Sequence, residues 1–264
     1  MNIFSSSPYS LQQVLRDFVK AVNAAGFSDR IVLKGGLNLE AAVQKYNANL
    51  VARPTVDADF HISKKESWEQ FLDEVPKKIS QSSQLGLSYS LKSRRGFDRF
   101  PGSDTVTLTS SQNHQFDVDM NISSFSGKTE IYVGGYLPGF TIPTMLADKV
   151  AVFLSTRIYR RSKDLYDLYL FSYLMDYAMN VLLPEIQEKL AVGKGIEIPY
   201  HIADPVKLEH AYSKLSGIPN KPSFETVCAR VITFVYPIAG QLNQAEISAA
   251  YWNPIQGEWV EKWS

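Results

Sequence analysis

Hydrophobic and polar positions alternate with two different periods along this 264-residue chain. Runs with a period of two predict strands, and runs with helical spacing predict amphipathic helices. Up to about residue 140 the two patterns are mixed. Helices are expected at 9–25, 37–47 and 65–81, and strands at 31–33, 56–62, 87–94, 104–110, 115–122 and 129–133. Pro76 is expected to kink or split the third of these helices.

From Pro143 onwards the pattern is mostly helical. The expected helices are 143–160, 163–181, 184–192, 205–216 and 222–248, with Pro237 interrupting the last one. The stretch just before them, which holds Gly134, Gly135, Pro138 and Gly139, is expected to be a loop. We therefore predict an α+β fold with two domains, a mixed half over residues 1–142 and a helical half over 143–264.

Charge and composition exclude several classes of protein. Basic and acidic side chains each number 27, so the net charge of zero excludes a polycationic nucleic-acid binder but leaves room for a local basic groove. The single cysteine, Cys228, excludes a disulfide framework and a cysteine-based zinc cluster. The sequence shows no secretory signal and no apolar window of about 18 residues, so we expect a cytoplasmic protein without a membrane span.

A glycine pair follows the first expected strand. Gly35 and Gly36 would let a ligand approach the backbone closely, and the next helix would offer free N–H groups to an anion at its N-terminus. Phosphate binding is the functional interpretation. The alternative is an ordinary tight turn between a strand and a helix, which is the commoner meaning of so short a motif.

Carboxylates recur on two of the expected strands. Asp57 and Asp59 are two residues apart, so they share one face of their strand and would repel each other. A divalent cation would remove that conflict, and Mg²⁺ prefers such oxygen ligands, whereas the alternative is a solvated polar face. Asp117 and Asp119 share one face of 115–122 in the same way, so this strand could complete a metal site or simply have one wet face.

A charged segment opens the helical half at 149–169, KVAVFLSTRIYRRSKDLYDLY. On an unbroken helix, Lys149, Arg160 and Asp167 would share one face. The cations between residues 157 and 163 could hold phosphates. The alternative is a charged pair of helices in which Asp164 and Asp167 form ion pairs with the arginines.

The order of these stretches is more specific than any one of them. Together they resemble the AbiEii/AbiGii toxin family, a branch of the DNA polymerase β-type nucleotidyltransferases that is related to the MenT-type toxins. The resemblance covers about residues 31–170 and is carried by Leu33-Lys34-Gly35-Gly36, by Arg53-x-Thr55-x-Asp57-x-Asp59, by Lys149, by Arg157 and by the KDLYDLY block at 163–169.

The resemblance implies a nucleotidyltransferase domain, with a mixed sheet flanked by helices, followed by a helical domain. It implies a toxin of a toxin–antitoxin or abortive-infection (phage defence) system that transfers a nucleotide from an NTP to an RNA 3′ end, with tRNA as the expected acceptor. Mg²⁺ would be the cofactor and an antitoxin protein a partner. The alternatives are a protein or small-molecule acceptor, transfer of a terminal phosphate only, and an inert binding module with the same fold.

The resemblance also implies a role for each matching residue. The expected metal ligands are Asp57, Asp59 and Asp119, and Asp117 competes with Asp119 for the third place. Lys149 would bind the triphosphate, and of Asp164 and Asp167 one would act in the site while the other would be structural. The expected nucleotide-binding residues are Gly35, Gly36, Arg53, Thr55, Lys149 and Arg157.

Overall fold

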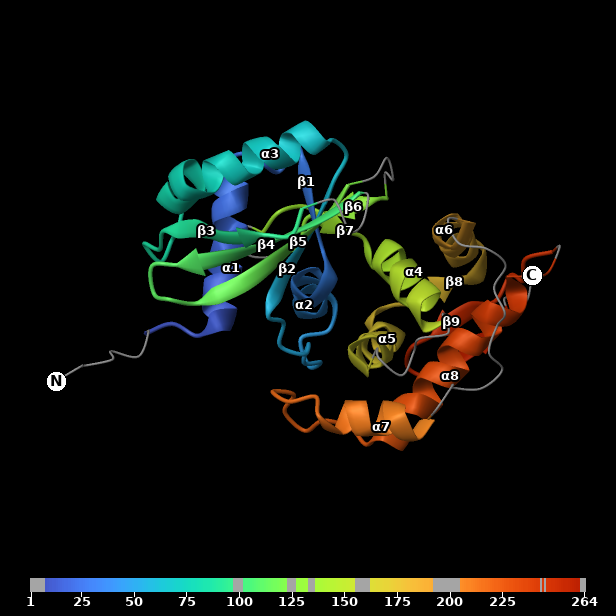
Figure 1. Ribbon diagram of the computed structural model, residues 1–264. Coiled ribbons are helices and arrows are strands. Elements are labelled where there is room, and N and C mark those ends of the chain that lie inside the picture. The colour runs from blue at the N-terminus through green and yellow to red at the C-terminus, as the bar shows by residue number, and fades with distance from the viewer. Residues whose placement is uncertain are drawn as a thin grey trace. The chain divides into compact units, whose positions relative to one another are not determined.

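The computed structural model describes residues 8–96, 102–122, 127–132, 136–154, 162–191, 205–242, 244 and 246–261. The chain divides into two compact units (Figure 1). The first unit combines Met1–Ala41 with Pro54–Phe140, and the second combines Ala42–Arg53 with Thr141–Ser264. Residues 42–53 therefore belong to the unit that contains the C-terminal half, although they lie early in the sequence.

The first unit is built on a mixed seven-stranded sheet in the order β3-β4-β5-β2-β1-β7-β6. Its strands are β1 (Ile31–Lys34), β2 (Asp57–Ile62), β3 (Tyr89–Arg94), β4 (Ser103–Ser110), β5 (Gln115–Ile122), β6 (Thr129–Glu130) and β7 (Gly139–Phe140). β2 runs parallel to β5, and β1 runs parallel to β7, whereas the other neighbours are antiparallel. This mixed sheet and the helices around it confirm the predicted α+β fold.

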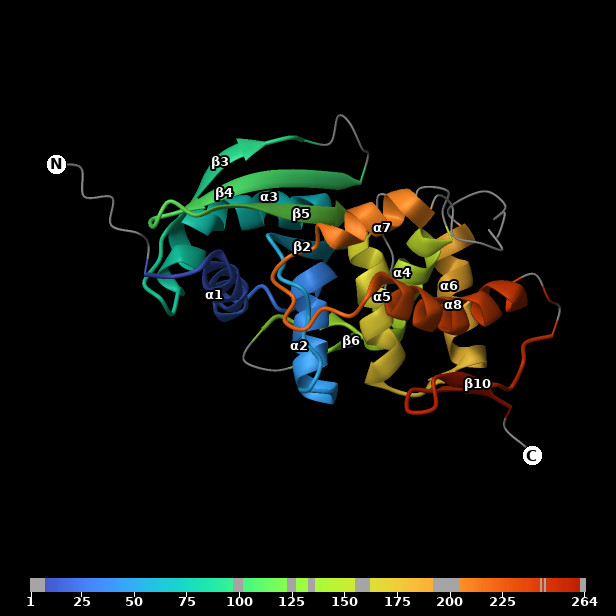
Figure 2. The same cartoon turned by 90° about the horizontal axis from the view of Figure 1, so that it is seen from below.

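Two helices cover the apolar face of this sheet, as the first unit shows in Figures 1 and 2. They are α1 (Leu11–Ala24) and α3 (Lys65–Glu74). Phe18 of α1 lies 6.3 Å from Phe60 of β2 between ring centroids, and Phe71 of α3 lies 5.9 Å from the same ring. All three rings are fully buried, so the hydrophobic core of the unit lies between the helices and this face.

Local signals explain where the helices of the first unit begin and end. Ser10 caps α1 with its hydroxyl and forms a capping box with Gln13. α2 (Gly35–Tyr46) starts directly after β1. The third expected helix is split as predicted, because Pro76 lies in a π-helical turn, η1 (Val75–Ile79), that follows α3.

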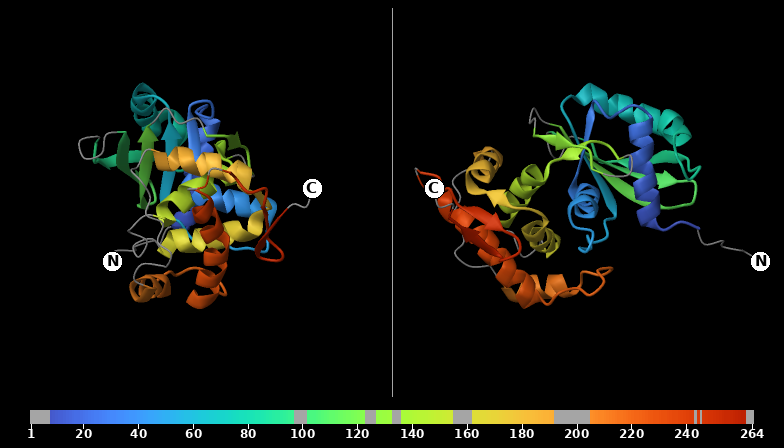
Figure 3. Two further views of the ribbon diagram at one scale, coloured as in Figure 1. Left: turned by 90° about the vertical axis from the view of Figure 1, so that its right-hand side faces the viewer. Right: turned by 180° about the vertical axis from the view of Figure 1, so that it is seen from behind.

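The second unit is mostly helical (Figure 3). Its helices are α4 (Ile142–Phe153), α5 (Ser162–Leu174), α6 (Met179–Ala191), α7 (Pro205–Ser213) and α8 (Phe224–Gln241). A small sheet, β8 (Tyr177–Ala178), β9 (Tyr251–Asn253) and β10 (Glu258–Val260), joins them in the order β10-β9-β8. Trp252 of β9 is fully buried, with its ring 4.6 Å from that of Phe234 in α8, so the small sheet is part of this core.

The structure differs from several sequence-based expectations. Gly139 and Phe140 form β7 instead of a loop, because Leu33 of β1 supplies a parallel partner that no local pattern can reveal. Pro237 does not interrupt α8, which continues to Gln241. The helix expected over 163–181 ends at Leu174, and β8 follows it; the helix expected over 222–248 ends at Gln241.

The charged segment is divided between two helices, as the expected helices 143–160 and 163–181 imply, so the unbroken helix on which Lys149, Arg160 and Asp167 would share a face does not form. α4 ends at Phe153, and α5 begins at Ser162. Arg157 and Arg160 lie outside the described residues, so their predicted contacts are not addressed. None of the helices in the described ranges is long and apolar enough to cross a membrane.

Candidate active site

Four carboxylates share one face of the sheet at its centre. In the parallel register of β2 and β5, Asp57 lies opposite Asp117, and Asp59 lies opposite Asp119. The intervening residues of both strands are fully buried on the helix-covered face. The four acidic side chains, in contrast, are only partly buried. The period of two along each strand therefore brings together the two acidic pairs that the sequence predicted separately.

Three of these carboxylates line one cavity. Asp57, Asp117 and Asp119 open into a cavity of about 340 Å³. The remainder of its lining consists of Leu11, Val56, Thr107, Gln115 and Phe116. Apolar side chains therefore lie next to charged ones, an arrangement that suits a ligand with both an apolar ring and polar groups.

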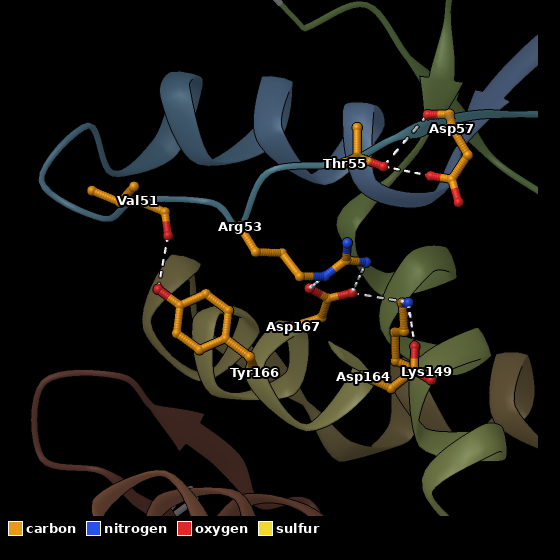
Figure 4. Close-up of polar contacts among 8 residues, drawn as sticks. All are labelled: Val51, Arg53, Thr55, Asp57, Lys149, Asp164, Tyr166 and Asp167. Carbon is orange, nitrogen blue, oxygen red and sulfur yellow. Dashed lines mark hydrogen bonds and ion pairs between the residues drawn. The ribbon is translucent and has the colours of Figure 1, made fainter. Parts of the chain in front are cut away.

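Three of the four carboxylates each accept a hydrogen bond from a different threonine hydroxyl. The donors and acceptors are Thr55 Oγ1 to Asp57 Oδ1 at 2.5 Å, Thr105 Oγ1 to Asp119 Oδ1 at 2.5 Å, and Thr107 Oγ1 to Asp117 Oδ1 at 2.7 Å. The first of them is drawn in Figure 4. These hydrogen bonds fix the direction in which each carboxylate points, as supporting groups do around metal ligands.

The glycine pair packs directly against the acidic strand. Gly35 has a φ of +65°, and a Cβ at this position would overlap the carboxylate of Asp59. A Cβ on Gly36 would collide with the side chain of Thr55. The first turn of α2 therefore lies beside Asp59. Glycine is required here by both the backbone conformation and the lack of space.

A buried ion-pair network forms a separate cluster within the second unit (Figure 4). Arg53 binds Asp167 through two parallel hydrogen bonds, Nε to Oδ1 at 2.9 Å and Nη2 to Oδ2 at 3.0 Å. Lys149 of α4 donates to Asp164 Oδ1 at 2.5 Å and lies 2.9 Å from Asp167 Oδ2. Asp164 and Asp167 both belong to α5, so the network joins two helices and the segment before Pro54.

The network controls the charges of its members. Burial raises the pKa of Asp167, but Lys149 and Arg53 outweigh it and hold the pKa below its usual value. Burial likewise lowers the pKa of Lys149, but Asp167 and Asp164 reverse the shift and raise it. At neutral pH Lys149 is therefore protonated and Asp167 ionised.

The residues predicted from sequence thus fall into two clusters. Gly35, Gly36, Thr55, Asp57, Asp59 and Asp119 lie together in the first unit, whereas Arg53, Lys149, Asp164 and Asp167 lie together in the second. Thr105 and Thr107 were missed, although the alternation in β4 signals a hydroxyl face. Among the described residues, no three His, Cys, Asp or Glu side chains form a ready-made metal-ligand group.

Comparison with known proteins identifies relatives of this arrangement. The family model described as the nucleotidyl transferase AbiEii toxin of a type IV toxin–antitoxin system matches residues 17–195. None of the curated proteins compared with the chain matches it.

Three solved structures share the fold. The MenT4 nucleotidyltransferase toxin from Mycobacterium tuberculosis has a TM-score of 0.59 and 15% identity, over 87% of this chain and 83% of that one. The JHP933 protein from Helicobacter pylori has a TM-score of 0.52 and 17% identity, over 87% and 90%. A further H. pylori structure, described as a nucleotidyltransferase, has a TM-score of 0.51 and 18% identity, over 89% and 96%.

Proposed function

Since the chain belongs to the AbiEii family of nucleotidyl transferase toxins, we propose that it transfers a nucleotide from an NTP to the 3′ end of RNA, with tRNA as the expected acceptor. The family belongs to type IV toxin–antitoxin systems, so we further propose that the chain is the toxin, that an antitoxin protein restrains it, and that phage defence is its role. One observation carries the proposed chemistry. Two acidic strands pair in register beside a glycine turn and line a common cavity.

The donor set supports a site for Mg²⁺. Asp57, Asp59 and Asp119 supply carboxylate oxygens from one sheet face, the ligand type that this ion prefers. Such close carboxylates repel one another, and a divalent cation would relieve the repulsion. When bound, Mg²⁺ would lower the pKa of the attacking hydroxyl and neutralise charge on the triphosphate. The hydrogen bonds from Thr55 and Thr105 would keep two of these ligands oriented.

The chain's own groups would do the remaining work. The N–H groups at the start of α2 would donate to phosphate oxygens. Asp119 lies on the strand next to Asp59 and would face the acceptor hydroxyl. The cavity beside these acids would hold the nucleoside that carries the hydroxyl.

The cluster in the second unit supports a role for Lys149 in phosphate binding. Its ammonium group is charged at neutral pH but paired with Asp164 and Asp167, so binding the triphosphate would require a phosphate oxygen to replace one of these partners. Asp167 is fully buried and shared between Arg53 and Lys149, so we propose that it is the structural acid of the pair. Asp164 accepts a hydrogen bond from Lys149 and would adjust the position of that ammonium group.

A labelling experiment tests the proposed reaction. The purified chain would be incubated with total RNA, Mg²⁺ and each α-³²P-labelled NTP in turn. We expect label in a tRNA-sized band, loss of about 100-fold or more in Asp57→Asn, and loss of label when Mg²⁺ is chelated. Asp73→Asn, on the exposed surface of α3, is the matched control and should label normally.

The products separate the alternatives. Release of pyrophosphate accompanies nucleotidyl transfer, whereas release of NDP would indicate transfer of a terminal phosphate. Label on protein instead of RNA would replace the proposed acceptor. Equal labelling by the wild-type chain and Asp57→Asn would refute the role of the acidic strands.

A further inference from the structure

The polar face of the central sheet extends beyond the carboxylates to the edge strand. In the sheet, β4 lies next to β5 on the side away from β2. Thr105 is opposite Asp119 and Thr107 is opposite Asp117, so the hydroxyls of β4 lie on the acidic face. β3 follows β4 and forms the edge of the sheet. Residues 88–96 contain no acidic side chain. Across this one face, the chemistry therefore changes from carboxylates through hydroxyls to a strand rich in cations.

Two cations of this edge lie over the polar face. A β-bulge between Leu91 and Ser93 places Lys92 there, and its Nζ donates to Gln115 Oε1 at 2.6 Å. Arg95 also reaches across β4, with its Nη2 3.4 Å from Asp117 Oδ2. The side chain of Arg95 is 66% exposed. Both side chains thus extend from the edge strand toward β5 and the cavity that Asp117 and Gln115 line.

The neighbouring Arg94 shows that not every cation of this segment faces the carboxylates. Its guanidinium lies on the opposite, helix-covered face, where it binds Glu69 and Asp104. Arg94 is therefore neutralised within the fold. Lys92 instead donates to a neutral amide, and the contact between Arg95 and Asp117 is long and exposed, so solvent or a ligand can exchange with it.

Topology separates these cations from the expected triphosphate site. The strand order β3-β4-β5-β2-β1 places β3 on one side of the acidic strands and the glycine turn after β1 on the other. Neighbouring strands are about 4.8 Å apart, so β3 and β1 are separated by roughly 19 Å. The charged groups of Lys92 and Arg95 reach as far as β5, so they lie on the opposite side of β2 from the glycine turn.

We propose that Lys92 and Arg95 bind backbone phosphates of the acceptor RNA upstream of its 3′ end, while the cavity holds the terminal nucleoside. The proposal deepens the proposed function and rests on it. The acidic face would repel a polyanion, and the two cations offset that repulsion on the side from which the acceptor arrives. Their charged groups lie beside Gln115 and Asp117, on the side of the cavity that faces the edge strand, so they would meet the phosphates of a chain whose terminal nucleoside occupies the cavity.

The test measures RNA binding without catalysis. A fluorescein-labelled single-stranded RNA oligonucleotide would be titrated with the full chain at several salt concentrations, without NTP. In the double variant Lys92→Gln/Arg95→Gln, the slope of log K against log salt should fall by about 1.4, since each lost phosphate contact on a single strand accounts for about 0.7. Lys77→Gln, on exposed η1, removes a charge elsewhere in the unit and should leave binding nearly unchanged.

A transfer assay completes the test. In the double variant, the KM for RNA should rise roughly tenfold or more, with the KM for NTP unchanged, because only the acceptor contacts are lost. Unaltered RNA affinity and salt slope in the double variant would overturn the inference even if transfer to RNA is confirmed. If the wild-type chain labels protein and does not bind RNA, the proposed acceptor and this inference both fail. A rise in the KM for NTP alone would assign the two cations to the triphosphate instead.

Discussion

Both the backbone conformation and the close contact with Asp59 require glycine at position 35. Its φ is +65°, and a Cβ would overlap the Asp59 carboxylate. We predict that Gly35→Ala displaces Asp59 and lowers nucleotidyl transfer by about 100-fold, measured by label incorporation. Gly86→Ala is the matched control, because Gly86 has a φ of +67° with open space around it.

The control separates backbone strain from displacement of the acid. Gly86→Ala should lose about 1–2 kcal/mol of unfolding free energy in a urea titration and retain its activity. Gly35→Ala should lose both stability and activity. Equal activity in the two variants would show that Asp59 does not depend on the glycine turn.

Asp117 and Asp119 have the same chemistry but different surroundings. Asp119 lies opposite Asp59, the acid that touches the glycine turn, whereas Asp117 lies nearer the edge cation Arg95. We predict that Asp119→Asn lowers the transfer rate by about 100-fold. Asp117→Asn should change it by less than about tenfold, because an exposed ion pair contributes only about 0–1 kcal/mol.

Single-turnover rates at saturating NTP and RNA would check this assignment. The opposite order of the two effects would transfer the third-acid role to Asp117. Similar losses in both variants would mean that the acids act as one set.

At the residue scale, the sequence predicts which acids share a face but not what surrounds them. The two-residue spacing is sufficient to pair Asp57 with Asp59, and Asp117 with Asp119. The parallel pairing of β2 with β5 comes from tertiary structure, and so does the support from Thr105. Short-range periodicity identifies candidate ligands, whereas strand neighbours complete the site.

At the scale of elements, α4 and α5 are joined through Asp167. Its folded pKa is lowered, so its stabilising contribution is present above the unfolded value of about 3.8 and is lost as pH falls through the lower folded value. We predict that Asp167→Asn lowers the free energy of unfolding by about 3–5 kcal/mol at pH 7, because it removes the paired carboxylate of the buried Arg53 and one of the two carboxylates that bind Lys149. The difference between variant and wild type should stay constant from neutral pH down to about pH 4 and shrink below it.

Urea titrations from neutral to acidic pH would measure this difference. The contribution of Lys149 to stability depends on pH in the opposite direction. Because its folded pKa is raised, this contribution is present below the unfolded pKa of 10.5 and is lost only at higher pH. Arg53→Lys is the conservative comparison and should also destabilise the chain, since lysine cannot form the two parallel hydrogen bonds. A stability difference for Asp167→Asn that persists unchanged well below pH 3.8 would contradict the ion-pair account.

Most elements of the sheet-containing half could be predicted because their hydrophobic periods are long enough to recognise. Those that could not are short and depend on partners. β7 has two residues and exists because β1 lies beside it. β9 and β10 have three residues each. β9 pairs with β8, which lies far away in sequence, and its Trp252 packs against α8. Pro237 within α8 shows the reverse case, in which tertiary packing overrides a local helix breaker.

At the scale of the whole molecule, the chain order differs from the order of the units. Residues 42–53 belong to the second unit, whereas the strand that follows them belongs to the first. Arg53 and Asp167 are 114 residues apart, so no local pattern in the sequence could indicate that they pair. The domain boundary predicted at residue 142 stays a prediction. Composition and periodicity cannot reveal that an early segment, residues 42–53, packs with the late part of the chain.

This crossing leads to a prediction about fragments. Residues 141–264 alone lack Arg53 and also the Val51 carbonyl, which accepts a hydrogen bond from Tyr166 at 2.9 Å. Asp167 then keeps Lys149 but loses its paired hydrogen bonds, so we expect the fragment to unfold at lower urea concentration than the same fragment with residues 42–53 fused to it through a flexible linker. The expected gain from the fused segment is about 3–5 kcal/mol, the usual loss when one partner leaves a buried ion pair. A fused version carrying Arg53→Ala should lose most of that gain. If the fusion with Arg53→Ala were as stable as the unmodified fusion, the segment would act through apolar packing alone, and the buried network would not be what ties residues 42–53 to the second unit.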